Sequence, residues 1–454
     1  MLLKYTGHPL IDVGLATLAA FVGKQRPEEL SEDDLETFAN WAIKEYDGNS
    51  ALKTWLMVSA FPGSIFTQPP LQSDKFTEDR LRYLKQDALF AWRERDALEE
   101  RCAFCERPAV LLGSRSMIPM FMSGIYFSPE GMAGLPACGY CMLALHAMPM
   151  GCLPSEGRLL LVHSHAYELT QRFVKGYLTN NRRILQILGL EKMPNYRHAK
   201  TRLLEELELV HQEGLLEEES GGVTAYHFTN SGQGPKLDIY QLPSFVIRFI
   251  REARTRYPEQ WAKIVQRAWA LSKEDYKRNY FYEDLFSLPD GARRFLHVYI
   301  LRNPLKAIRN KEDPRRDYST YAEAELISWG IAELLLEMMN MERERIEQIR
   351  GLGDALAQYI LARDERFFSR LYMVRDYPAL RRELIRAAKD ADATLVPFDT
   401  FVAVFEDSEE VGRPDWRLAF DLLLIRIIEQ LHKGGKDDLL KETTESAAES
   451  EPAA

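Results

Sequence analysis

The chain has 454 residues, of which 46% are hydrophobic and 28% are charged. This composition excludes general disorder and is sufficient for two or three domains with hydrophobic cores. No segment has the apolar length of a membrane span and the first residues lack the apolar region of a signal peptide, so we expect a cytoplasmic protein without membrane contact.

Charge is distributed unevenly along the chain, although the net charge of -10 by itself argues against nucleic-acid binding. Residues 158–202 contain nine Lys and Arg against two Glu, and residues 246–316 contain seventeen against nine acids. Acidic blocks offset these runs at 28–47, at 203–220 and after Lys433. Each basic run is either a solvated helix face or, because Tyr, Phe, Trp and Asn are interleaved with it, part of a surface that follows a phosphate backbone.

Periodic apolar residues predict helices in the first hundred residues. A helix is expected over 9–22, a second from Ser31 to Gly48, and a third over about 77–96. Between the last two, residues 61–70 contain too much proline for regular structure. They predict an ordered loop with polar side chains, including Gln68, at its tip.

Four of the five cysteines form two CxxC pairs, Cys102 with Cys105 and Cys138 with Cys141. Two thiolates on a tight turn, used twice, are the ligand set of a tetrahedral zinc site, so we expect one zinc ion. Closing the loop between the pairs costs roughly 3 kcal/mol of chain entropy. Structural zinc offsets this cost, since it contributes on the order of 10 kcal/mol. The alternatives are two unrelated pairs of buried thiols, or a disulfide in a secreted protein.

The segment between the two pairs lacks the residues of an active site. Residues 106–137 contain no His, Asp or Asn, and their only acids are Glu106 and Glu130. Two glutamates cannot supply a metal-ligand set, a general base and an orienting group together, so we expect the zinc to be structural. His146 and Cys152 are either substitute ligands or a packed histidine and a buried free thiol.

The rest of the chain predicts a small sheet followed by helices. A short buried strand is expected at 159–162, a basic helix at 167–188 and a β-hairpin over 223–242. We therefore expect an α+β, predominantly helical protein. Its expected parts are an N-terminal zinc-containing domain (1–157), a basic α+β middle region (158–335), a C-terminal helical bundle (336–433) and a disordered acidic tail (434–454).

Polar and basic side chains in the two basic runs are candidates for nucleic-acid contact. Asparagine amides and arginine guanidiniums can bind phosphates or, in a groove, base edges. The alternative for each residue is a polar position on a helix surface. The candidates are Lys175, Asn180, Asn181, Arg182, Arg183, Arg251 and Arg254.

Three segments of the N-terminal third resemble one known protein family. They are Tyr5-Thr-Gly-His-Pro-Leu-Ile-Asp-Val-Gly14, Pro62-Gly-Ser-Ile-Phe-Thr-Gln-Pro69, and Cys102-Ala-Phe-Cys105 joined to Gly134-Leu-Pro-Ala-Cys-Gly-Tyr-Cys141. In these segments the chain resembles the zinc-containing large subunit of type I-B CRISPR interference complexes, the RNA-guided assembly called Cascade. The remainder agrees with this family in length and general order.

The resemblance implies a non-catalytic subunit of a complex that serves either antiviral defence or the targeting of another machine such as a transposon. Such a subunit helps recognise the protospacer-adjacent motif on double-stranded DNA, aids unwinding, and contacts guide RNA and the displaced strand. The implied partners are the backbone, guide-end-binding and small subunits of Cascade and a recruited nuclease or other effector, and the C-terminal bundle resembles the small subunit. As readers of the adjacent motif we select Gln68 and residues 180–183.

Two other functions stay open at this point. One is a metal-dependent nuclease whose acidic residues come from distant parts of the chain. The other is a zinc-stabilised scaffold that binds only protein.

Overall fold

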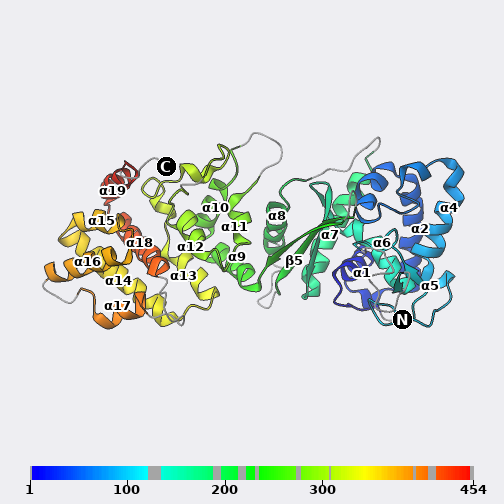
Figure 1. The fold of residues 1–454 in the computed structure, drawn as a ribbon, viewed down its shortest axis with the longest axis horizontal. Helices are drawn as coiled ribbons and strands as arrows, with labels where there is room; N and C mark the ends of the chain where they lie inside the picture. The colour runs from blue at the N-terminus through cyan, green and yellow to red at the C-terminus, as the bar shows by residue number, and fades with distance from the viewer. Residues whose placement is uncertain are drawn as a thin grey trace. The chain divides into compact units, whose positions relative to one another are not determined.

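The computed structural model describes residues 3–120, 134–187, 196–212, 221–230, 235–271, 278–305, 308–391, 395–406 and 416–449. The chain is mostly helical with a few small sheets (Figure 1), in agreement with the expected mainly helical α+β class. Among the described residues, no helix combines the length and the apolar composition that crossing a membrane requires.

Helices α1 (Pro9–Phe21) and α2 (Glu32–Gly48) form where the sequence predicts them. Pro9 occupies the first turn of α1, where its missing N–H leaves no helical hydrogen bond unmade. At the start of α2 the Ser31 hydroxyl accepts a hydrogen bond from the Asp34 N–H, and the Asp34 carboxylate accepts one from the Ser31 N–H. This capping box satisfies two backbone donors that the helix itself leaves free.

The third expected helix, over 77–96, is interrupted in the structure. Helix α4 (Thr77–Arg82) continues into the π-helical turn η5 (Tyr83–Leu89), and α5 (Ala91–Glu94) follows. The break occurs because Phe90 leaves the helical conformation, with φ -119° and ψ 15°. The π-helical turn buries the three apolar residues Leu84, Ala88 and Leu89.

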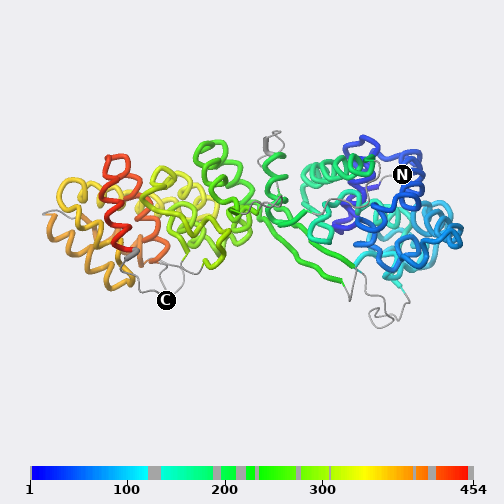
Figure 2. The backbone as a smooth tube through the Cα atoms, turned by 90° about the horizontal axis from the view of Figure 1, so that it is seen from above, coloured from blue at the N-terminus to red at the C-terminus, as the bar shows by residue number. Residues whose placement is uncertain are grey.

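A four-stranded antiparallel sheet follows, in the order β3 (Leu153–Ser155), β4 (Arg158–Ser164), β5 (Val223–Thr229) and β6 (Lys236–Leu242). The expected hairpin is confirmed, and Figure 2 shows β5 and β6 as long strands side by side. The expected buried strand is β4, which packs against α1 and α7 (Tyr167–Leu185). Helix α8 (Ala199–Gln212) lies between β4 and β5 in the sequence.

Helices dominate the chain after the sheet. They are α9 (Ser244–Arg256), α10 (Pro258–Arg267), α11 (Tyr280–Leu285), α12 (Ala292–Phe295), the π-helical η8 (Leu296–Ile300) and α13 (Trp329–Met338). Their core is aromatic, and neighbouring ring centroids in it lie 5.0 to 6.3 Å apart. The rings belong to Phe249, Trp261, Phe281, Phe295 and Tyr299.

The C-terminal helices form a bundle. They are α14 (Arg343–Ala362), α15 (Glu365–Tyr372), α16 (Tyr377–Asp390), α17 (Phe398–Phe405) and α18 (Trp416–Lys433). Helices α14 and α18 pack against each other, and Arg426 Nε donates to Asp354 Oδ1 over 2.7 Å.

The expectation of a disordered tail over 434–454 is wrong for residues 437–449, which form α19 (Asp437–Glu449). Leu440, Thr443 and Ala447 are buried at helical spacing on one face, where α19 packs against α15 and α18. The many charged residues around these three concealed that face in the sequence. Residues 450–454 lie outside the described residues.

The chain divides into two compact units, Met1–Ser244 and Phe245–Ala454, which we call the N-terminal and C-terminal units. This division differs from the expected boundaries near 157 and 335. Strand β4 and helix α7 pack on α1, so they belong with the N-terminal unit. Helices α12 and α13 pack on α18, so they belong with the C-terminal unit.

Candidate metal centre

The first cysteine pair lies on a tight turn of the backbone. The Cys102 N–H donates to the Arg107 carbonyl oxygen over 2.7 Å, and the Glu106 N–H donates to the Cys102 carbonyl oxygen over 2.9 Å. Glu106 has the left-handed conformation, with φ 61°, which a side chain adopts only at some cost in energy. This turn reverses the chain and places Cys102 and Cys105 on the same side.

The second cysteine pair lies at the start of helix α6 (Gly139–Ala147). Strand β1 (Leu111–Gly113) pairs with β2 (Leu135–Ala137), and β2 leads directly into Cys138. Cys138 is the N-cap of α6, and its Sγ accepts a hydrogen bond from the Cys141 N–H over 3.4 Å. The positive end of a helix dipole favours a thiolate at this position.

The four cysteine sulfurs form one compact cluster and lie within 4.8 Å of one another. The Cys105 sulfur is 3.5 Å from the sulfurs of both Cys138 and Cys141. Backbone hydrogen bonds between the two halves fix this arrangement, since the Ala103 N–H donates to the Pro136 carbonyl oxygen over 2.9 Å. The four thiols can hold a metal ion.

The thiols of the cluster differ in acidity because they hydrogen-bond to one another. The pKa of Cys102 is lowered well below its ordinary value because its sulfur accepts hydrogen bonds from Cys105, Cys138 and Cys141. The pKa values of Cys138 and Cys141 are raised, first of all by their hydrogen bonds to Cys102, which keep them as neutral donors. Ionising all four therefore requires a cation among them.

His146 and Cys152 are packed side chains outside this cluster. The His146 ring is stacked on Phe61 with centroids 4.5 Å apart, and its Nδ1 lies 2.8 Å from the Met142 carbonyl oxygen. The Cys152 thiol donates to the Met148 carbonyl oxygen over 3.3 Å, and burial raises its pKa. The sequence allowed two interpretations of these residues. The one confirmed is that His146 is a packed histidine and Cys152 a buried free thiol.

The N-terminal segment, residues 5–14, lies against the metal centre. In α1, Gly14 packs directly on the backbone of Ala144 in α6, the helix that begins with the second cysteine pair. The His8 ring meets the Phe104 ring edge to face with centroids 4.9 Å apart, next to the first cysteine pair. The segment therefore contacts both halves of the cluster.

A buried carboxylate holds this segment in place. Asp12 Oδ1 accepts hydrogen bonds from the N–H and the hydroxyl of Thr6 over 2.8 and 3.0 Å, and Oδ2 accepts one from the Gly7 N–H over 3.1 Å. Asp12 Oδ2 also lies 3.1 Å from His163 Nε2 at the end of β4. One side chain thus connects residues 6 and 7, α1 and the sheet.

The proline-rich loop packs on the same helix from another direction. Phe66 lies between Tyr46 and Tyr83, with ring centroids 6.0 Å from each. Its ring is 6.2 Å from that of His146 in α6. Tyr46 donates to the His146 carbonyl oxygen over 2.6 Å. Helix α6 is therefore the common support of the loop, the N-terminal segment and the second cysteine pair.

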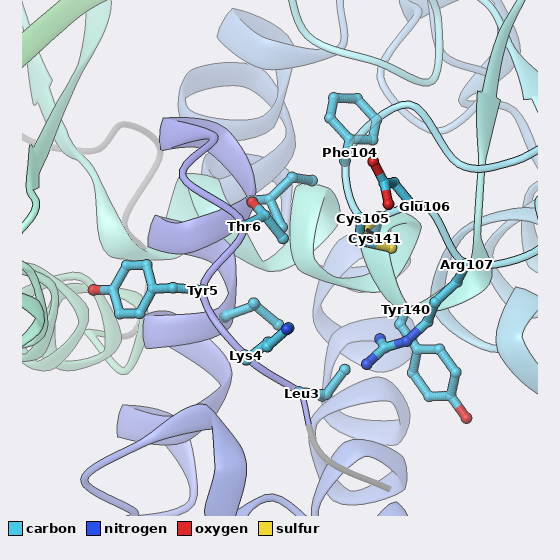
Figure 3. Close-up of a pocket in the computed structure, with 12 residues that line it drawn as sticks. Leu3, Lys4, Tyr5, Thr6, Phe104, Cys105, Glu106, Arg107, Tyr140 and Cys141 are labelled. Atoms are coloured by element: carbon cyan, nitrogen blue, oxygen red, sulfur yellow. Dashed lines mark hydrogen bonds between the residues drawn. The ribbon is translucent and has the colours of Figure 1, made fainter.

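A cavity of about 360 Å³ lies beside the cysteine cluster, between residues 3–6 and the turn of the first pair (Figure 3). Lys4 and Arg107 both extend into this space, and the Arg107 guanidinium lies 5.5 Å from the centroid of the Tyr140 ring. Glu106 lines the same cavity, so two cationic groups face one acid there, and the excess positive charge favours an anionic group. Sequence reasoning missed both residues. The position of Arg107, two residues after Cys105, was a usable signal, whereas nothing in the sequence marks Lys4.

The prediction of nucleic-acid contact by Asn181 is wrong. Asn181 is fully buried, and its Nδ2 donates to the carbonyl oxygens of Met150 and Cys152 over 3.0 and 2.8 Å. Its amide thus links α7 to the segment that immediately precedes β3. Helical spacing was the sequence signal that indicated burial of Asn181, because this residue follows the buried Val174 and Leu178 on the same helix face.

The other candidates on α7 are more accessible. Lys175 and Arg183 are exposed, and Asn180 and Arg182 are half-buried. Arg183 donates to Asn180 Oδ1 over 3.3 Å, while the Arg182 guanidinium lies 4.5 Å from the centroid of the Phe21 ring. The exposed face of α7 therefore carries a small basic surface.

The remaining candidates lie elsewhere. Gln68 is half-buried, and its amide donates to the Gly63 carbonyl oxygen over 3.1 Å, which closes the proline-rich loop. Arg251 and Arg254 lie on α9 in the C-terminal unit, and Arg251 pairs with Glu252 at 3.0 Å.

Within the described ranges, no second group of three or more His, Cys, Asp or Glu side chains is placed to hold a metal ion. Glu130, named above as an acid between the cysteine pairs, lies outside those ranges. Comparisons with protein-family models, with curated proteins and with solved structures find no match to this chain.

Proposed function

We propose that this protein is the non-catalytic, zinc-stabilised large subunit of a type I-B CRISPR RNA-guided surveillance complex, Cascade. In this role it recognises the protospacer-adjacent motif on double-stranded DNA, aids unwinding, and binds guide RNA and the displaced strand. The observation that carries the proposal is the meeting of three segments at α6. These are the same three segments whose sequences resemble the family.

Each of the three segments has a definite contact with α6. Gly14 of the first packs on Ala144, and Phe66 of the second lies against His146. The third supplies Cys138 and Cys141 at the start of the helix. Resemblance confined to segments that pack together is what a shared structural unit would produce, whereas chance matches would be scattered over the molecule.

We propose zinc as the metal of the cysteine cluster. Zinc–sulfur bonds of about 2.3 Å in a tetrahedron place the sulfurs ~3.8 Å apart, close to the 3.5 Å that separates Cys105 from Cys138 and Cys141. Four thiolates fill a tetrahedral site and leave no position for water or substrate, so the ion would act structurally. Because iron also accepts four thiolates, elemental analysis of the purified protein is the deciding measurement.

Two places in the N-terminal unit suit contact with nucleic-acid phosphates. One is the exposed face of α7 with Lys175 and Arg183. The other is the cavity beside the cysteine cluster, into which Lys4 and Arg107 extend. We assign base reading to Gln68, whose loop packs on the same helix as that cluster.

Co-expression with the neighbouring genes, followed by purification of the tagged chain, tests the proposal. We expect the chain to co-purify with the other Cascade subunits and with guide RNA. The purified assembly should prefer some flanking sequences in a library of targets with randomised flanks. Gln68→Ala should relax that preference, while Arg107→Ala should weaken binding to all targets alike.

The control is Lys44→Ala, which removes an exposed lysine on the acidic helix α2 of the same unit and should leave binding unchanged. A tagged chain that purifies without guide RNA contradicts the proposal. Metal-dependent cleavage of DNA by the isolated chain would favour the nuclease alternative. An assembly without DNA affinity at low salt would favour the protein scaffold.

A further inference from the structure

The C-terminal unit contains a cavity of about 930 Å³ that the proposed function does not use. Helices α18 and α19 and the segments around Asn303 and Tyr321 form part of its wall. Residues of α12 and η8, the end of α15 and residues 374–375 form the rest. This volume is in the range of pockets that hold a small organic ligand.

Aromatic rings line much of this cavity. Tyr321, Tyr372 and Trp416 are half-buried, so part of each ring is covered by protein and part remains accessible. Phe420 is buried behind them, with its ring centroid 6.1 Å from that of Trp416. Partly covered rings favour a planar aromatic ligand, which stacks on them as nucleic-acid bases do.

The charge at the mouth of the cavity is mainly positive. Four arginines line it, against the two acids Asp421 and Glu445. The Arg417 guanidinium lies 5.5 Å from the centroid of the Trp416 ring, so a cation stands directly beside an aromatic face. Guanidinium groups bind phosphate through paired hydrogen bonds. The four arginines are Arg293, Arg316, Arg375 and Arg417.

Three buried polar atoms in the wall lack a hydrogen bond, namely His297 Nδ1, the Tyr318 hydroxyl and Asp421 Oδ2. The Asp421 side chain is only 5% exposed, and its Oδ2 lies 2.9 Å from Arg293 Nε. That contact does not have hydrogen-bond geometry, so Oδ2 has no hydrogen-bonded partner. The ion pair with Arg293 offsets part of the cost of burying this carboxylate, and an N–H group of a ligand would supply the hydrogen bond that is missing. The amino and imino groups of nucleobases are such donors.

We propose that this cavity binds a nucleotide. The base stacks against the aromatic rings and donates an N–H to Asp421, while the phosphate binds the arginines at the mouth. The nucleotide is either a free one or a unit of a single strand, since both present a base and a phosphate. This site lies in the C-terminal unit. Binding of a free nucleotide is independent of the proposed function, whereas binding of a unit of a single strand rests on it, because guide RNA and the displaced strand are single strands.

Calorimetric titration of the full chain with ATP, CTP and GTP, and separately with a short single-stranded oligonucleotide and its abasic counterpart, tests the proposal. Saturable binding of a triphosphate identifies a free nucleotide. Binding of the oligonucleotide alone, lost in its abasic counterpart, identifies a unit of a strand. Absence of binding in both series overturns the proposal.

Two substitutions of acids separate base recognition from simple charge attraction. Asp421→Asn removes the negative charge and replaces one acceptor oxygen by an NH2 donor, and we expect about tenfold weaker binding. Glu445→Gln is the matched control, because it removes the same charge from the wall at an exposed position. If charge alone attracted the ligand, both variants would bind more tightly, and that result would overturn the proposal.

Arg417→Gln tests the phosphate contact independently, and it serves if Asp421→Asn fails to fold. Arg417 is exposed, so its replacement should leave the fold intact and weaken phosphate binding several-fold. The control is Arg343→Gln, an exposed arginine of the same unit that does not line the cavity. Equal affinity of both variants and the unchanged chain would place the ligand elsewhere.

Discussion

Gly14 in α1 lies so close to Ala144 in α6 that a Cβ atom on Gly14 would stand 2.1 Å from the Ala144 carbonyl oxygen. No real side chain is found at that distance. Protein interiors are close-packed, and one backbone atom cannot move without its neighbours. The absence of a side chain at one position therefore sets how closely the N-terminal helix approaches the helix of the metal centre.

Gly14→Ala should destabilise the N-terminal unit by roughly 2 kcal/mol or more, since the two helices must move apart. We expect a melting temperature lower by about 5 °C or more. Gly176→Ala is the control, because it lies in the interior of α7 with only Glu206 at 4.0 Å from the added Cβ. Alanine there should stabilise the helix by about 0.5–1 kcal/mol. Equal melting temperatures for the two variants would contradict the close contact.

The purified chain should contain one metal ion, and Cys138→Ser should lose it. Serine removes one of four thiolate ligands, while its hydroxyl oxygen can still accept the hydrogen bond at the start of α6. Cys152→Ala is the control, since Cys152 is a buried thiol outside the cluster and its loss should leave the metal content unchanged. Elemental analysis after extensive dialysis measures both. Retention of a full equivalent of metal by Cys138→Ser would show that the ion is bound elsewhere.

Metal binding should release protons, chiefly from Cys138 and Cys141. Their pKa values are raised by hydrogen bonds to Cys102 and Cys105 and then by burial, so both carry protons near neutral pH when no cation is present. The ion requires thiolates, so its apparent affinity should fall as the pH falls. Calorimetry in two buffers with different ionisation enthalpies measures the protons released. A heat of binding that is the same in both buffers would contradict the expectation.

The sequence predicted the cysteine cluster because its signal is local, with each CxxC pair contained within four residues. It could not predict the packing around α6, because Gly14 and Ala144 are far apart in the chain. A glycine or an alanine by itself does not indicate which residue it contacts. Asn181 was misassigned because a polar residue type was given more weight than helical spacing. The burial of Leu440 in α19 was not predicted for the opposite reason. The composition of its charged neighbours was given more weight than the helical spacing of a short apolar face.

His146 should make the N-terminal unit less stable as the pH falls below neutrality. Burial lowers the pKa of His146 from 6.5 to about 4, although the hydrogen bond to Met142 partly opposes this. Between these two values the unfolded chain binds a proton that the folded chain does not, so stability decreases as the pH decreases through this window. The total loss is about 3 kcal/mol, and it levels off below about pH 4.

Denaturant unfolding at several pH values between 6.5 and 4 measures this effect. His146→Gln should show a smaller slope of stability against pH than the unchanged chain, because it lacks the titrating ring. The metal centre contributes to both slopes, so its effect cancels in their difference. His165→Gln replaces an exposed histidine of the same unit and should keep the original slope. Identical slopes in all three proteins would contradict the assignment to His146.

Asn181→Ala and Arg183→Ala should have opposite consequences although the two residues are neighbours on α7. Asn181→Ala removes the donors of two buried carbonyl oxygens, those of Met150 and Cys152, and should cost ~1–3 kcal/mol of stability. Arg183→Ala changes an exposed position and should alter stability by less than about 0.5 kcal/mol.

In the proposed Cascade assembly, Arg183→Ala should lower the affinity for all DNA targets and reduce the salt dependence of binding by about one phosphate contact. Thermal unfolding of the isolated chain and DNA titrations at several salt concentrations separate the two effects. If Arg183→Ala left both affinity and salt dependence unchanged, the basic face of α7 would be a solvated helix surface. If Asn181→Ala weakened binding without loss of stability, its buried position in the folded chain would not be the one it occupies on DNA.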